Sequence, residues 1–130
     1  MLDQHHLNLP KPLRDSNSYT LGSIGSHNVV VACLPKGKTG SIPAALVATQ
    51  MVNAFPSVRF VLMVGIGSGV PPKVRLGDMV VSVPTANSPG VVEWEVDNAT
   101  QEIRRTGALN NPPDLLLTAL SRLETEHELI

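Results

Sequence analysis

The sequence has few aromatic residues, 3% of its 130 residues, and a single cysteine, Cys33. One cysteine excludes an internal disulfide, which is typical of a reducing compartment, so we expect a cytoplasmic protein. No apolar stretch reaches the ~20 residues of a membrane-spanning helix. The start of the chain lacks the basic and apolar segments of a secretory signal. We therefore expect no contact with a membrane.

An excess of charge is lacking too: ten basic and eleven acidic residues give a net charge of −1. Because nucleic-acid-binding proteins carry a basic surface, we expect no nucleic-acid partner. Hydrophobic residues make up 42% of the chain, which is typical of a globular domain. With so few aromatics the core must be aliphatic, as in buried sheets. Cys33, inside the run VVVACLP, is predicted to be buried.

The first third of the chain predicts a tail followed by a hairpin. Residues 1–18 are polar and contain Pro10 and Pro12, which predicts a loop or tail. His5 and His6 are adjacent, which is poor spacing for a metal site, and we expect no metal. Residues 19–34 alternate apolar and polar positions around a turn rich in Gly and Ser, which predicts a β-hairpin. Its second strand is apolar on both faces, which predicts a central strand in a covered sheet.

The middle of the chain predicts a strand–helix–strand unit. Ser41 and Pro43 open a helix over residues 41–55 that is apolar nearly all round and should be buried. The apolar run 58–65 follows as a strand, parallel to the previous one through a right-handed crossover. Further strands are expected over 74–83 and 90–96, and an amphipathic helix over 111–127. The predicted fold class is α/β, a three-layer arrangement with a mixed, mainly parallel sheet and flanking helices.

The stretch FVLMVGIGSGVPPKVRLGDMVVSV, residues 60–83, contains three alternating glycines, Gly65, Gly67 and Gly69. The spacing differs from the dinucleotide-binding fingerprint, and Pro71–Pro72 precede a strand pattern where that site needs a helix. A phosphate-binding P-loop is also disfavoured, because no Gly-Lys-Ser/Thr follows. Two interpretations stay open on spacing alone: a tight bend with a bulge, or a backbone that approaches a flat ligand.

A resemblance to a known family favours the second interpretation, a backbone that approaches a flat ligand. MVGIGSGVPPKVRLGDMVVSVP resembles the central motif of the nucleoside phosphorylase and nucleosidase superfamily, and LPKGKTGSIPAALVATQM resembles its earlier loop and Ala-rich helix. In particular the chain is similar to the phosphorylase-like domains of fungal multidomain proteins, which are often joined to NTPase and repeat modules. That group also has the segments NSYTLG…HNVV and RTGALNNPPDLLLTAL. The likeness covers about residues 15–126.

The resemblance implies cleavage of a nucleoside N-glycosidic bond, with a nucleoside as the small-molecule partner, no cofactor, and phosphate as a candidate co-substrate. Residues carried over to the pocket that contacts base and sugar are Gly65, Ile66, Gly67, Ser68 and Gly69. Phosphate-using members often have an arginine at the position of Met63 and a serine or threonine at that of Ile66. Neither side chain here can hold an anion, which favours hydrolysis over phosphorolysis. Family members are commonly oligomers, so a homo-oligomer is implied.

Residues 19–130 are expected to form the N-terminal portion of such a domain. The Met-Glu pair that contacts ribose in the family and its acid near the base find no match here, so the catalytic residues stay unknown. The alternative is a non-catalytic nucleoside-sensing or regulatory module of a larger signalling protein.

One group of carboxylates lies outside these motifs. Glu93, Glu95 and Asp97 alternate with Val92, Trp94 and Val96, so on a strand the carboxylates share one face. Paired carboxylates serve glycosidases. We favour instead a solvated strand face opposite a buried face that carries Trp94. Asp78, in Leu-Gly-Asp, is similarly interpreted as structural.

Overall fold

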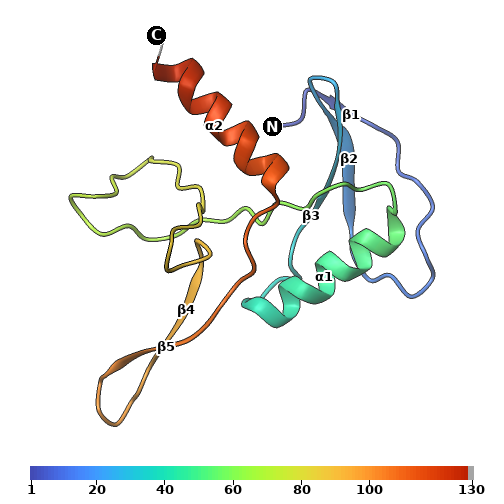
Figure 1. Cartoon of the computed structure of the whole chain (residues 1–130). Helices are drawn as coiled ribbons and strands as arrows, with labels where there is room; N and C mark the ends of the chain where they lie inside the picture. Colours follow the sequence, from blue (N-terminus) through green and yellow to red (C-terminus); the bar gives the residue numbers. More distant parts are fainter. Residues whose placement is uncertain (129–130) are drawn as a thin grey trace. The chain divides into compact units, whose positions relative to one another are not determined.

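The computed structural model describes residues 1–128, which form two compact units that divide between Met63 and Val64. The first unit contains β1 (Gln4–His5), β2 (Tyr19–Ile24), β3 (His27–Ala32) and α1 (Ser41–Ala54) (Figure 1). The second contains β4 (Val92–Val96), β5 (Ile103–Ala108) and α2 (Asp114–Glu128). The domain predicted over residues 19–130 runs through both units and ends two residues beyond the described part.

The predicted hairpin of residues 19–34 is confirmed. β2 and β3 pair antiparallel from Tyr19 opposite Ala32 to Ile24 opposite His27. Gly25 closes the turn with a φ of 55°, a left-handed conformation that glycine adopts without steric cost. β1 adds a short third strand inside the predicted tail, and the strand order is β1-β2-β3. β3 is therefore an edge strand, and the prediction of a central position for it is wrong.

Alternation along residues 15–21 separates a buried face from an exposed one. Asp15, Asn17 and Leu21 are buried, whereas the residues between them, Ser16, Ser18 and Thr20, are exposed. Successive side chains of an extended segment point to opposite sides, so the odd-numbered residues share one side. Leu21 is the only buried apolar residue in the described part of the chain. The small core of the first unit lies on this side.

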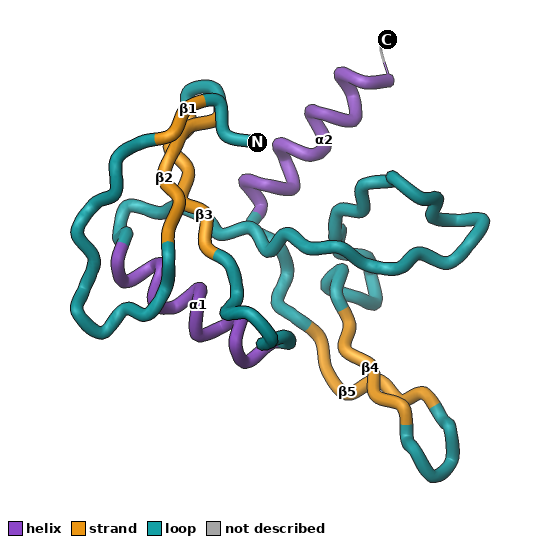
Figure 2. Tube along the Cα trace, turned by 180° about the vertical axis from the view of Figure 1, so that it is seen from behind, coloured by secondary structure: helices purple, strands orange, loops and turns teal. Residues whose placement is uncertain are grey.

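Helix α1 is attached to the buried side of this segment. The Nδ2 of Asn17 donates a hydrogen bond to the carbonyl of Val47 over 2.9 Å. The rings of Tyr19 and Phe55 meet edge to face with centroids 5.0 Å apart. Figures 1 and 2 both show the helix beside the hairpin. Ser16 Oγ also donates to Oε1 of Gln50 over 3.2 Å, so two hydrogen bonds and one aromatic contact join the helix region to the hairpin and the segment before it.

The helix predicted over 41–55 is confirmed in position, but its predicted burial is wrong. It begins after Gly40 without a side-chain cap, and none of its residues is buried. Ile42 is 83% exposed and Leu46 is 59% exposed. A helix that is apolar all round is buried only when neighbouring elements pack on several of its sides. The contacts described for α1 are those with the hairpin and the segment before it, and they leave its other apolar side chains exposed.

The predicted mainly parallel, three-layer sheet is wrong. The chain forms two antiparallel sheets, β1-β2-β3 and β4-β5. Residues 58–65 and 74–83, predicted as strands, are neither strand nor helix and run as open coil (Figure 1). Their apolar side chains are largely exposed, for example Leu62 at 62% and Val80 at 73%. Antiparallel hairpins close over short turns, whereas parallel pairing needs a long crossover, so the local pairings form and the parallel one does not.

The second unit contains an antiparallel hairpin and a helix. β4 confirms the strand predicted near 90–96, and β5 is an additional strand. The register places Trp94 opposite Arg105 and shifts at a bulge between Glu93 and Trp94. Trp94 is 57% exposed, so the buried face predicted for it is wrong. The helix predicted over 111–127 is confirmed as α2, with Asp114 in its first turn.

Neither helix of the described residues has the length and apolar character that crossing a membrane requires.

Candidate functional site

The five residues predicted to bind a nucleoside form one exposed loop. Ile66 is 106% exposed, and residues 65–69 are all exposed. At Gly65 and Gly67 no heavy atom, apart from those of the glycine and its two chain neighbours, lies within 4 Å of the position that a Cβ would occupy. Neither glycine has a left-handed φ. The fold of the described chain therefore does not require glycine at either position, and the backbone there is open to a ligand.

Gly69 differs from its two neighbours. A Cβ at this position would lie 2.5 Å from Cγ1 of Val74, far inside contact distance. The two residues are brought together by the turn after the loop, in which the amides of Lys73 and Val74 donate to the carbonyl of Val70 over 3.1 and 3.3 Å. Gly69 is thus required for packing within the loop.

Asp78 stabilises the next turn. Its Oδ2 accepts the backbone N–H of Arg75 over 2.9 Å, and its Oδ1 lies 3.3 Å from Arg75 Nη2. Gly77, between them, has a φ of 92°. A carboxylate that accepts a backbone amide three residues away fixes local conformation. The structural interpretation of Asp78 fits these contacts.

The two positions that bear on phosphate are both apolar and exposed, with Met63 at 76% and Ile66 at 106%. Their side chains offer an anion no hydrogen-bond donor.

The carboxylates of the β4–β5 hairpin have separate surroundings. Asp97 Oδ1 accepts the amides of Ala99 and Thr100 over 2.8 and 3.2 Å, so it holds the hairpin turn. Glu93 and Glu95 are exposed on the strand. Glu93 and Glu95 thus lie on solvated positions of the strand, as expected, whereas Asp97 lies in the turn and not on the strand face predicted for it.

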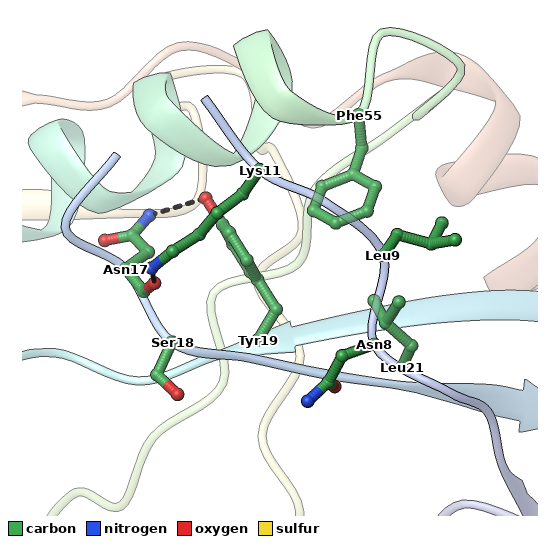
Figure 3. Close-up of a pocket in the computed structure, with 8 residues that line it drawn as sticks. All are labelled: Asn8, Leu9, Lys11, Asn17, Ser18, Tyr19, Leu21 and Phe55. Atoms are coloured by element: carbon green, nitrogen blue, oxygen red, sulfur yellow. Dashed lines mark hydrogen bonds between the residues drawn. The ribbon is translucent and has the colours of Figure 1, made fainter. Parts of the chain in front are cut away.

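The first unit contains a polar cluster that no sequence motif predicted. Asp15 Oδ2 accepts the hydroxyl proton of Tyr19 over 2.6 Å, and its Oδ1 accepts the backbone N–H of Asn17 over 2.9 Å. Asn17 Nδ2 also donates to the Tyr19 hydroxyl over 3.0 Å, and Lys11 Nζ donates to the Asn17 carbonyl (Figure 3). The signal in the sequence was weak: polar residues before a strand are usually solvated, but here their alternation turns two of them inward.

The cluster shifts two pKa values in opposite directions. Burial raises the pKa of Asp15, but the hydrogen bonds from Tyr19 and Asn17 and the charge of Lys11 outweigh it, so this pKa lies below its ordinary value. Burial and the bond to Asp15 raise the pKa of the Tyr19 hydroxyl. The pair is thus held as a carboxylate and a neutral phenol.

A cavity of about 170 Å³ opens beside this cluster (Figure 3). The residues that line it come from the N-terminal segment, the start of β2 and the end of α1: Asn8, Leu9, Lys11, Asn17, Ser18, Tyr19, Leu21 and Phe55. Its lining combines aromatic and aliphatic surface with a lysine and amides.

A second cavity, of about 350 Å³, is lined in part by the exposed side of the same segment and by β3. Ser16, Ser18 and Thr20 contribute hydroxyls, and Cys33 contributes its thiol. Cys33 is exposed, so the prediction that it is buried is wrong. It follows the last residue of an edge strand, where no second layer covers it.

Comparison with known proteins found sequence similarity to a fungal protein. Over 134 aligned residues it is 47% identical to a nucleotide-binding leucine-rich repeat (NLR)-like protein of Hyaloscypha variabilis, a match that covers 99% of the chain. The chain spans 13% of the length of that relative. No protein-family model and no solved structure matches it. The match is compatible with the fungal, repeat-linked setting that the resemblance implied.

Proposed function

We propose that this chain binds nucleosides through residues 65–69, as part of a nucleoside-phosphorylase-like module within a larger NLR-like protein. The chemistry proposed for the module is cleavage of the N-glycosidic bond, by hydrolysis in preference to phosphorolysis. The substrate class is a nucleoside, and water takes the place of phosphate as the attacking group.

The observation that carries this proposal is the open backbone at Gly65 and Gly67. Glycine lowers the stability of an extended segment because it has more freedom in the unfolded chain. Here neither backbone conformation nor packing in the described chain requires it. Bare peptide edges allow a flat base or a sugar to approach closely. Ser68, between Gly67 and Gly69, adds a hydroxyl that can donate or accept a hydrogen bond.

The preference for hydrolysis rests on Met63 and Ile66. A phosphate bound for attack needs cationic or multiple N–H donors. Both side chains beside the loop are apolar and exposed, so they supply no such donor.

Calorimetric titration of the chain with adenosine, inosine and uridine tests the binding. We expect Gly67→Val to weaken binding by about tenfold or more, since a side chain there occupies the space of the ligand. Because that space is otherwise empty, the melting temperature should stay unchanged. Ala99→Val, which adds bulk to an exposed turn of the same unit, is the matched control and should bind normally. Equal affinity of the Gly67→Val variant would contradict the proposal.

A second candidate function, a nucleoside-sensing module without turnover, is favoured by the match to 13% of an NLR-like protein. An assay for released base, with and without phosphate, separates the two. Base release in phosphate-free buffer supports hydrolysis, and binding without release supports sensing.

A further inference from the structure

The cavity in the first unit is independent of the glycine loop. All of its lining residues lie between Asn8 and Phe55, within the first unit. Three of the lining residues, Asn17, Tyr19 and Leu21, also stabilise the first unit. A ligand bound in this cavity is therefore independent of the proposed nucleoside function.

The size of the cavity limits its ligand. Its volume is about 170 Å³. An apolar cavity of roughly 150 Å³ holds a benzene molecule. A ligand with one six-membered ring and a small substituent therefore fits the space.

The lining divides into an apolar part and a polar part. Phe55, Leu9 and Leu21 offer apolar surface, and Tyr19 adds a second ring (Figure 3). The polar part includes Lys11, the only charged residue of the lining. Its ammonium group has three N–H donors, and one of them is used on the carbonyl of Asn17. Two donors thus remain for an anionic group on the ligand.

The nearby carboxylate of Asp15 interacts with the charge of Lys11 but forms no salt bridge with it among the described residues. Asp15 does not line the cavity, and its two oxygens accept hydrogen bonds from Tyr19 and from the Asn17 amide. None of the eight described lining residues is acidic, so a carboxylate on the ligand meets no like charge on the wall.

We propose that this cavity is a binding site for a small aromatic carboxylate, with the ring against Tyr19, Phe55 and Leu21 and the carboxylate at the Lys11 ammonium. The ring replaces water on the apolar wall, and the charge pair fixes the orientation. A neutral amide of the same shape keeps the apolar contact but loses the ion pair.

Titration of the full chain with benzoate, followed by amide NMR shifts, tests the proposal. We expect saturable shifts at Tyr19, Leu21 and Phe55, with affinity in the millimolar range because the ligand is small. Benzamide should bind about threefold or more weakly, which is the modest effect expected of an exposed charge pair.

Two variants separate the site from general stability. Lys11→Gln should reduce benzoate affinity to that of benzamide, while Lys38→Gln, an exposed lysine of the same unit outside the cavity, should leave it unchanged. Phe55→Leu should weaken benzoate and benzamide alike, because it removes ring contact and no charge. Equal binding of benzoate and benzamide, or unchanged binding of benzoate in Lys11→Gln, would each overturn the proposal.

Discussion

At the scale of single residues, Asp15 and Tyr19 contribute most to order in the first unit. Their side chains form a short hydrogen bond, 2.6 Å between the phenol and the carboxylate. Through Asn17 the same cluster reaches the backbone of α1 at Val47. Since few apolar side chains are buried in the described chain, this polar cluster carries an unusual share of the tertiary contacts.

Tyr19→Phe should destabilise the first unit. It keeps the ring contact with Phe55 but leaves a carboxylate oxygen without its donor. For a unit of this size we expect the melting temperature to fall by about 5 °C. Circular dichroism during heating measures it, with Phe55→Tyr as the control that keeps both rings. An unchanged melting temperature would show that the bond adds nothing.

Stability should also fall in acid because of Asp15. Its pKa in the folded chain lies below the ordinary value of 3.8. A group with a lowered pKa contributes stability above its unfolded pKa and loses it as pH falls through the folded pKa. Asp15→Asn should therefore flatten the decline in unfolding free energy below about pH 4. Urea titrations from pH 2 to pH 6 measure this. A decline as steep as that of the native chain would rule out Asp15 as its source.

At the scale of elements, the sequence was informative where partners are close along the chain. The β2–β3 hairpin and both helices follow from local alternation, turn residues and helix-starting residues, and all three were predicted. β5 was missed because IRRTGA lacks the alternation of a half-buried strand. The strands expected over 58–65 and 74–83 failed for the opposite reason: an apolar run shows that a segment avoids water but not which segment pairs with it.

β1 depends on one glycine of β2. A Cβ at Gly22 would lie 2.2 Å from the carbonyl oxygen of Gln4, so any larger residue must push β1 away. We expect Gly22→Ala to release β1 while the β2–β3 pairing stays. Amide exchange at Asp3 and His6, which donate to Ser23 and Leu21, should speed up in this variant. Ser26→Ala, in the exposed hairpin turn, is the control. Retained protection at both amides would mean that the strand tolerates the methyl group.

At the scale of the whole chain, the mainly parallel sheet predicted around residues 65–69 was wrong, and their role in binding a nucleoside stays a prediction. Residues 65–69 lie together because they are consecutive, and their glycines and exposure depend on local sequence. The cavity beside Tyr19 was not foreseen, since it joins residues up to 47 positions apart, from Asn8 to Phe55. Distant contacts of that kind depend on how the N-terminal segment and α1 meet one sheet, and no motif encodes that.

The amide NMR spectrum of the chain during titration with adenosine, inosine and uridine tests the central proposal most directly. If residues 65–69 bind nucleosides, the amides of Gly65, Gly67 and Ser68 should shift and saturate with at least one of the three. The amide shift of Gly37, in an exposed loop of the first unit, should not change. Saturation without shifts in the loop, or no shift with any nucleoside, would contradict the proposed function.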